Sequence, residues 1–180
     1  MAQLIGFLFG SIPSGYLIGL INGVDVRKVG SGNIGATNIY RALGSGWANL
    51  VFTLDLVKGL IPVAILSDPW VLPFVVLGHC FTPWLMFRGG KGVSTLIGAA
   101  IPLYSLPLLI ALIVWFVVRR KSRIVSLASI SFAISLPFFI FVLLGFFSLP
   151  VLITSVIVIL RHYENLRRLI SGNEPETDFM

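Results

Sequence analysis

Long apolar runs alternate with short polar clusters along this chain of 180 residues. A helix that spans a membrane needs about 20 apolar residues. Uncharged runs of about this length or more occupy residues 4–21, 69–87, 92–118 and 124–160. The last run is long enough for two spans, because Gly, Ser and Pro cluster at 145–150 and predict a turn there. The pattern therefore predicts an all-α chain of membrane-spanning helices.

A further candidate span, residues 47–66, contains two charged side chains. Asp55 and Lys58 are three positions apart and so share one side of a helix. Charges inside a membrane usually pair with one another. We expect a structural ion pair, buried in protein or at the membrane interface.

Composition supports the membrane class, since 57% of the residues are hydrophobic and only 11% are charged, with a mean hydropathy of +0.99. Soluble proteins have roughly 25% charged residues. The net charge of +6 would suggest nucleic acid in a soluble chain, but here it belongs to loops that flank the membrane. We expect no nucleic-acid partner. Cys80 is the single cysteine, which excludes a disulfide framework and predicts a small buried hydrophobe.

The basic residues predict which loops face the cytoplasm, where Lys and Arg collect in short loops. All of the thirteen except Lys58 form four groups: Arg27, Lys28 and Arg41; Arg88 and Lys91; Arg119, Arg120, Lys121 and Arg123; Arg161, Arg167 and Arg168. If all four groups are cytoplasmic, residues 92–118 must enter the membrane from the cytoplasmic side and return to that side. These 27 residues make only about 40 Å of helix, which is too short for two full spans.

Pro102 and Pro107 offer a break in this segment. We expect a half-depth segment over 93–100, a turn, and a helix over 103–118. This makes seven crossings, counting the split segment, with the N-terminus outside and the C-terminus in the cytoplasm. A single span over 92–118 is the alternative. We further expect one transmembrane domain over 1–172 and a flexible cytoplasmic tail over 173–180.

The first polar cluster runs from Gly30 to Asn38 and is followed by Arg41. Its glycines let the chain turn with its amides pointing inward, and hydroxyl and amide donors are added by Ser31, Asn33, Thr37 and Asn38. Such a loop before a helix N-terminus favours an anion. A glycine-rich turn capped by Ser and Asn is the alternative interpretation.

The second cluster, residues 88–95, places Lys91 between glycines at the start of a segment. It does not match a nucleotide-binding P-loop, because Gly92 follows the lysine instead of Ser or Thr. A lysine there can act as a point charge for phosphate, or merely anchor a cytoplasmic loop. His79 lies just upstream in an apolar run. It could belong to the functional cluster, or it could equally be a histidine that packs between helices.

The third cluster, Arg161 to Asn165, ends the last span. A continuous helix would place His162 and Asn165 on one face. His162 can exchange protons near neutral pH, although a structural histidine is also common at a membrane boundary. Ser126 and Ser129, also three apart, fit ordinary packing of small residues between helices.

Together these motifs resemble the bacterial membrane acyltransferase family that acylates glycerol 3-phosphate with acyl phosphate. The resemblance covers nearly the whole chain. It rests on four ordered motifs: residues 30–38 with Arg41, Gly78-His79 with 87–93, residues 126–129, and residues 161–165. It implies a seven-helix fold in the bacterial cytoplasmic membrane, with the clusters converging on the cytoplasmic face.

The resemblance also implies the site residues. The expected catalytic residues are Ser31, Lys91 and His162, and the expected substrate-binding residues are Gly30, Asn33, Thr37, Arg41, Gly89, Gly90, Ser129 and Asn165. Ser31 and Ser129 are expected to hold the donor phosphate, and His162 and Asn165 to hold glycerol 3-phosphate. The hydroxyl proton could pass to His162 or to a substrate phosphate, and the second is favoured because no carboxylate in the motifs is placed to orient His162.

We expect no cofactor and no metal, since no clustered carboxylates are present to ligate one. The expected partners are the two substrates and the lipid bilayer. The chain also lacks the His-x4-Asp signature of acyl-CoA-dependent glycerol phosphate acyltransferases. The alternative function is a transporter of a phosphorylated anion, because discontinuous helices with N-termini aimed at substrate are also transporter features.

Overall fold

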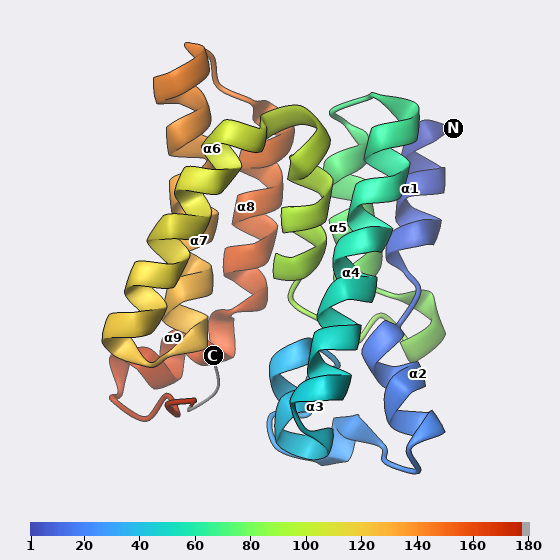
Figure 1. Cartoon of the computed structure of the whole chain (residues 1–180). Coiled ribbons are helices and arrows are strands. Elements are labelled where there is room, and N and C mark those ends of the chain that lie inside the picture. Colours follow the sequence, from blue (N-terminus) through green and yellow to red (C-terminus); the bar gives the residue numbers. More distant parts are fainter. Residues whose placement is uncertain (178–180) are drawn as a thin grey trace. The chain divides into compact units, whose positions relative to one another are not determined.

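The structure, a computed structural model, describes residues 1–177 as helices joined by short loops, which confirms the all-α prediction for that part of the chain (Figure 1). The α-helices are α1 (Ala2–Gly10), α2 (Ser14–Ile21), α3 (Ala36–Leu43), α4 (Ser45–Leu66), α5 (Val71–Cys80), α6 (Val93–Ser122), α7 (Val125–Leu144), α8 (Leu149–Arg161) and α9 (Tyr163–Ile170). Two short 3-10 helices, η1 (Val26–Lys28) and η2 (Pro83–Leu85), lie in the loops. The chain forms two compact units, Met1–Pro102 and Leu103–Met180.

In the first unit, α1 packs directly on α5 through glycines. A Cβ added at Gly10 would lie 1.9 Å from the carbonyl oxygen of Val75, and one at Gly78 would lie 2.1 Å from that of Phe7. Only glycine allows the two backbones to approach this closely, as in other membrane helix pairs. This contact fixes α5, which carries His79.

The first apolar run lies within one candidate span, Ala2–Ile21, as predicted, but the helix is interrupted inside it. α1 ends at Gly10 and α2 begins at Ser14, because Pro13 cannot donate a backbone hydrogen bond and the helix breaks before it. The carbonyl of Ile12, inside the break, accepts a hydrogen bond of 2.7 Å from Lys58 Nζ. A side chain of α4 therefore satisfies a backbone group that the break leaves outside a helix.

The predicted ion pair on α4 is confirmed. Lys58 Nζ lies 2.7 Å from Asp55 Oδ1, and both side chains are buried. The same helix packs on the first turns of α6, where a Cβ at Gly98 would lie 1.9 Å from the carbonyl oxygen of Leu56. α4 thus holds the start of α6 close, immediately after Lys91.

The expected break in the 92–118 segment is present. α6 departs from helical geometry at Tyr104, with φ −140° and ψ 42°. This position lies between Pro102 and Pro107, as predicted. That the segment leaves the membrane and returns on the same side stays a prediction.

In the second unit, α7 and α8 are joined by a turn over residues 145–148, within the predicted 145–150, and Gly145 has φ +76° there. The Tyr104 hydroxyl lies 2.8 Å from Ser148 Oγ within this unit. α8 and α9 then meet at a bend of 59°. Because the bend falls at His162, the third polar cluster lies at a helix junction instead of on one continuous helix.

Four helical segments of the described chain are long and apolar enough to span a membrane: Ala2–Ile21, Ser45–Leu66, Val93–Ser122 and Val125–Leu144. The bent pair of α8 and α9 makes five if it counts as one span, and the apolar helical stretch Val71–Leu85 is shorter. A multi-pass membrane protein is therefore supported. The predicted count of seven crossings stays a prediction.

Candidate active site

Asn38 organises the glycine loop of the first cluster. Its side-chain oxygen accepts a 2.9 Å hydrogen bond from the Ser31 amide, and its side-chain nitrogen donates to the carbonyls of Val26 and Val29 at 2.9 and 3.0 Å. Asn38 is 1% exposed. Gly30 is required beside it, because its φ is +56° and an added Cβ would lie 2.4 Å from Asn38 Oδ1. Asn38 therefore holds the backbone of the loop in place from its buried side.

The loop leads directly into a helix, as predicted. The Gly35 amide donates to Asn33 Oδ1 at 2.8 Å, and Gly35 is the N-cap of α3. Ser31 and Arg41 are exposed on the loop and the helix, and Thr37 is half-buried in the first turn of α3. Exposed polar groups on a buried polar frame are suited to bind an anion from the aqueous side.

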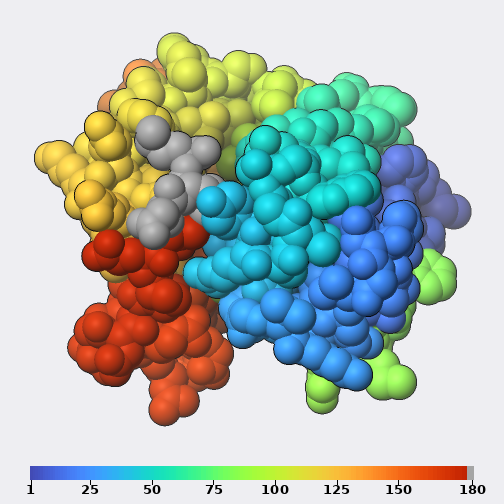
Figure 2. Space-filling model, turned by 60° about the horizontal axis from the view of Figure 1, so that its bottom comes forward, coloured from blue at the N-terminus to red at the C-terminus, as the bar shows by residue number. Residues whose placement is uncertain are grey.

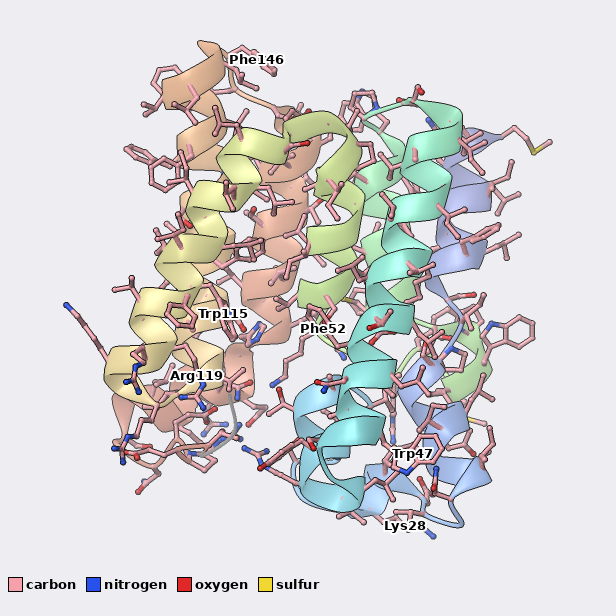
Figure 3. The ribbon with its side chains drawn as sticks, in the orientation of Figure 1. Lys28, Trp47, Phe52, Trp115, Arg119 and Phe146 are labelled. Atoms are coloured by element: carbon pink, nitrogen blue, oxygen red, sulfur yellow. The ribbon has the colours of Figure 1, made fainter. Side chains whose placement is uncertain are left out.

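The charges just upstream are partly compensated. Arg27 Nε lies 2.9 Å from Asp25 Oδ1, and its guanidinium lies over the Tyr16 ring. The hydrogen bond from Arg27 lowers the pKa of Asp25 to about 2. Lys28 is exposed on the same loop (Figure 3). Because Asp25 offsets Arg27, Arg41 is the better candidate to meet a substrate charge.

The second cluster is built around His79. The Gly90 amide donates to the carbonyl of His79 at 3.0 Å, and the Gly89 amide donates to that of Cys80 at 3.1 Å. A Cβ at Gly90 would lie 2.0 Å from His79 Nε2, so the glycine is required for packing. These bonds hold the loop before Lys91 against the end of α5. Cys80 is buried, as predicted.

Asp55 ties this loop to the ion pair on α4. Its Oδ1 atom lies 3.6 Å from His79 Nδ1 and 2.7 Å from Lys58 Nζ. All three side chains are at most 6% exposed. Lys91 follows the loop, half-buried, and Gly92, with φ +87°, precedes the first turn of α6. The buried charges thus support the backbone that carries Lys91.

The third cluster lies in the second unit. His162 is 3% exposed, and its Nδ1 atom lies 2.7 Å from the carbonyl oxygen of Val158. In the neutral ring, a proton on Nδ1 leaves the lone pair on Nε2. The His162 carbonyl accepts from the Leu166 amide at 2.8 Å. His162 therefore joins α8 to α9, and the contact of Nδ1 with the Val158 carbonyl orients its ring.

Asn165 and Ser129 are buried in the same unit, at 5% and 4% exposure. Trp115 Nε1 lies 3.4 Å from Ser129 Oγ, and the Asn165 side chain donates to Glu174 Oε1 at 2.5 Å. Sequence reasoning did not single out Glu174, which lies in the segment expected to be a flexible tail. Residues 178–180 of that segment lie outside the described residues.

The model of the family described as "Glycerol-3-phosphate acyltransferase" matches residues 1–172. This match covers nearly the whole chain and all three clusters. The chain belongs to the glycerol-3-phosphate acyltransferase family. Two acyltransferases of this name are similar to it: that of Rubrobacter xylanophilus is 44% identical, covering 95% of this chain and 91% of the relative, and that of Aquifex aeolicus is 41% identical, covering 95% of each.

Two solved structures of the integral membrane acyltransferase PlsY also share this fold. The glycerol 3-phosphate form has a TM-score of 0.90 and 40% identity, covering 98% of this chain and 94% of that one. The lysophosphatidic acid form has a TM-score of 0.86 and 39% identity, covering 97% and 93%. The resemblance found from the motifs is thus confirmed at the level of the family and its membrane fold.

The expected site residues fall into two groups in this acyltransferase. The first unit carries Gly30, Ser31, Asn33, Thr37, Arg41, Gly89, Gly90 and Lys91, and the second carries Ser129, His162 and Asn165. The amides of Gly89 and Gly90 already donate to backbone carbonyls. Any role of these two glycines in binding must therefore come from the shape of the loop. The catalytic and binding roles of all these residues stay predictions.

Proposed function

We propose that this protein transfers a fatty acyl group from acyl phosphate to the sn-1 hydroxyl of glycerol 3-phosphate, giving lysophosphatidic acid and inorganic phosphate. One observation carries the proposal. The chain is about 40% identical, over nearly its full length, to PlsY structures described in a glycerol 3-phosphate form and a lysophosphatidic acid form. Those two compounds are the acceptor and the product of this reaction.

The reaction needs positioning more than a covalent intermediate. Acyl phosphate is a mixed anhydride, so the sn-1 oxygen can attack the carbonyl carbon directly while the carbon–oxygen bond to phosphate breaks. Both substrates carry phosphate charge. Arg41 and Lys91 would compensate this charge, with Ser31 and Ser129 on the donor phosphate. His162 and Asn165 would hold glycerol 3-phosphate.

The hydroxyl proton would pass to a phosphate oxygen of the substrates. His162 is the other candidate acceptor. A catalytic base of the triad type is oriented by a carboxylate, whereas His162 Nδ1 faces the neutral carbonyl of Val158 at 2.7 Å. This contact orients the ring, but it stabilises a positive charge on it less than a carboxylate would.

The membrane setting supports the same function. The protein would cross the bacterial cytoplasmic membrane seven times, with the N-terminus outside and the clusters facing the cytoplasm, where all four basic groups would lie. A transporter of a phosphorylated anion is the alternative. It predicts flux of glycerol 3-phosphate through proteoliposomes in the absence of acyl donor, which an acyltransferase does not.

Lys91 gives the sharpest test of the proposed chemistry. With purified protein, palmitoyl phosphate and glycerol 3-phosphate should yield lysophosphatidic acid, whereas acyl-CoA should not, and the activity should survive EDTA. Lys91→Met should lower kcat/KM about a hundredfold or more, because one electrostatic donor is worth about 3 kcal/mol in a transition state. Lys91→Arg should recover little of this activity, since the planar guanidinium group is a poor replacement for the compact ammonium charge of lysine.

The matched control is Lys121→Met, which removes an exposed lysine outside the expected site and should leave the rate unchanged. Equal turnover with acyl phosphate and acyl-CoA would contradict the proposal. A folded Lys91→Met protein with full activity would contradict the role of Lys91 alone.

A further inference from the structure

The end of the described chain folds back onto the second unit. The Asn173 amide donates to the carbonyl of Arg168 at 2.8 Å, and the Thr177 amide donates to that of Arg123 at 3.0 Å. The Arg119 guanidinium donates to the Thr177 carbonyl. In Figure 2 the red C-terminal residues lie against the yellow residues that join α6 to α7. Residues 173–177 thus cross from the end of α9 to this connection.

The fold-back places one carboxylate on three donors. Glu174 Oε1 accepts from Ser126 Oγ at 2.7 Å and from Asn165 Nδ2 at 2.5 Å, while Arg168 Nε lies 2.7 Å from Glu174 Oε2. Ser126 comes from α7, and the other two donors come from α9. Ser126 and Asn165 are only 6% and 5% exposed. A hydroxyl, an amide and a guanidinium converge here on a single anion.

Glu174 is ionised at neutral pH in this setting. Burial alone would raise the pKa of its carboxyl, but the hydrogen bonds from Ser126, Asn165 and Arg168 outweigh burial and lower the pKa below its ordinary value. The three donors therefore bind a charged group, which indicates a site built for an anion.

The same donors suit a phosphate monoester. Phosphate and carboxylate oxygens accept the same charge-assisted hydrogen bonds, and arginine is especially suited to both. Phosphate also offers three oxygens and up to two negative charges, where the carboxylate offers two oxygens and one charge. The three donors lie inside the segment that matches the family, residues 1–172, while Glu174 lies beyond it. The anion on these donors is thus the chain's own tail.

We propose that Ser126, Asn165 and Arg168 form a phosphate-ester site that Glu174 occupies in the absence of substrate, and that the phosphate group of glycerol 3-phosphate displaces this carboxylate. The choice of ligand rests on the proposed function, in which Asn165 holds glycerol 3-phosphate. The tail then competes with the acceptor substrate. While the tail is bound, the site is closed to substrate, so the apparent affinity for glycerol 3-phosphate is reduced in proportion to the fraction of time that the site is open.

The first test compares saturation curves for glycerol 3-phosphate in the full-length protein. Glu174→Gln and Glu174→Ala should each lower the KM for glycerol 3-phosphate about three- to tenfold at an unchanged maximal rate, which corresponds to a tail bound for about 70 to 90% of the time. Glu176→Gln is the matched control, because it removes an exposed carboxylate from the same tail and should leave KM unchanged. An unchanged or raised KM in both Glu174 variants would overturn the proposal.

Direct binding separates this proposal from the proposed function. Calorimetric titration with glycerol 3-phosphate and with inorganic phosphate, without acyl donor, should show tighter binding of both in Glu174→Gln than in the wild type. If Glu174→Gln binds both anions more tightly than the wild type but neither protein turns over substrate, the phosphate-ester site is supported and the proposed acyl transfer is contradicted. If the wild type and Glu174→Gln bind each anion with the same affinity, the proposal that the tail occupies the site is contradicted, whatever the activity.

Arg168→Gln tests whether the contact between Arg168 and Glu174 reflects competition between the tail and the substrate or only stabilises the fold. It should raise the KM for glycerol 3-phosphate, since it removes a donor to the substrate. Adding Glu174→Gln to this variant should then lower KM by a smaller factor than it does in the wild type, because without Arg168 the carboxylate is held only by Ser126 and Asn165 and competes less. Additive effects of the two changes would count against a shared site.

Discussion

A single buried amide determines the form of the candidate anion loop. Asn38 binds the Ser31 amide and the carbonyls of Val26 and Val29. We expect Asn38→Ala to destabilise the protein by about 3 kcal/mol, because each buried polar group left without a partner costs about 1–3 kcal/mol. Thermal unfolding in detergent should show the loss, and turnover should fall because Ser31 is no longer held.

Asn22→Ala is the control for this prediction. Asn22 is half-buried, and its side chain donates a hydrogen bond to the carbonyl of Ile18 at 2.8 Å. Its removal should cost about 1 kcal/mol or less and leave turnover intact. Equal destabilisation by the two substitutions would show that Asn38 does not organise the loop.

The role of Asn38 illustrates what residue types alone can show. Glycine, Ser and Asn between apolar runs predicted an anion loop before a helix, and α3 does begin at Ala36. Asn38 was predicted only to add a polar side chain to the cradle. Its partners, Val26 and Val29, lie 12 and 9 residues away, and their position depends on the path of the loop. Spacing along the chain does not determine that path.

At the scale of elements, the loop before α6 depends on contact with the end of α5. A Cβ at Gly90 would lie 2.0 Å from His79 Nε2 and 2.7 Å from Cε1. We expect Gly90→Ala to displace either the ring or the loop. Unfolding should begin at a lower temperature, and kcat/KM should fall at least tenfold because Lys91 moves with the loop.

Gly46→Ala provides the matched control in the first turn of α4. Within residues 1–177, no heavy atom lies within 4 Å of a Cβ at that position apart from the flanking residues and the nearby backbone of α4, so the change should be neutral or stabilise the protein by up to about 1 kcal/mol. A Gly90→Ala protein that retains both stability and activity would show that the His79 ring yields without moving Lys91.

Helix bounds followed from hydropathy where polar residues end an apolar run, but not where the chain breaks inside one. Residues 47–66 were predicted as a span, and α4 covers Ser45–Leu66. Residues 4–21 were also predicted as a span, and Ala2–Ile21 is long and apolar enough for one, but the helix inside it is broken into α1 and α2. This break is stabilised by Lys58, whose Nζ atom reaches the carbonyl of Ile12, 46 positions earlier in the sequence. Such long-range compensation has no signature in local hydropathy.

For the whole molecule, composition was sufficient to predict the membrane class and the motifs were sufficient to predict the family. The number of crossings was harder to predict, because α5 is only 10 residues long and the last apolar run ends in the bent pair α8 and α9. The tail was expected to be flexible because residues 173–178 have the polar and charged composition of disordered segments. Its contacts with Ser126 and Asn165 depend on tertiary structure that composition cannot reveal.

Sidedness can be tested at the connection between α6 and α7. Lys121 is exposed there, whereas the neighbouring Ser122 hydroxyl bonds to Val118 and accepts from the Ile124 amide, so Lys121 is the better place for a probe. In a Cys80→Ser background, we expect Lys121→Cys to resist an impermeant thiol reagent in intact cells and to react once the membranes are opened. The reason is that four clustered basic residues favour the cytoplasm.

Phe147→Cys supplies the opposite control in the turn between α7 and α8, where Phe147 is 70% exposed and no basic residue is near in sequence. This cysteine should react in intact cells, because an odd number of crossings separates the two positions in the seven-crossing arrangement. Labelling of Lys121→Cys together with protection of Phe147→Cys would instead favour one span over 92–118. In that arrangement Arg119 and Arg123 would lie outside the cell, and the third cluster, which α8 separates from the turn, would face away from the cytoplasmic supply of glycerol 3-phosphate.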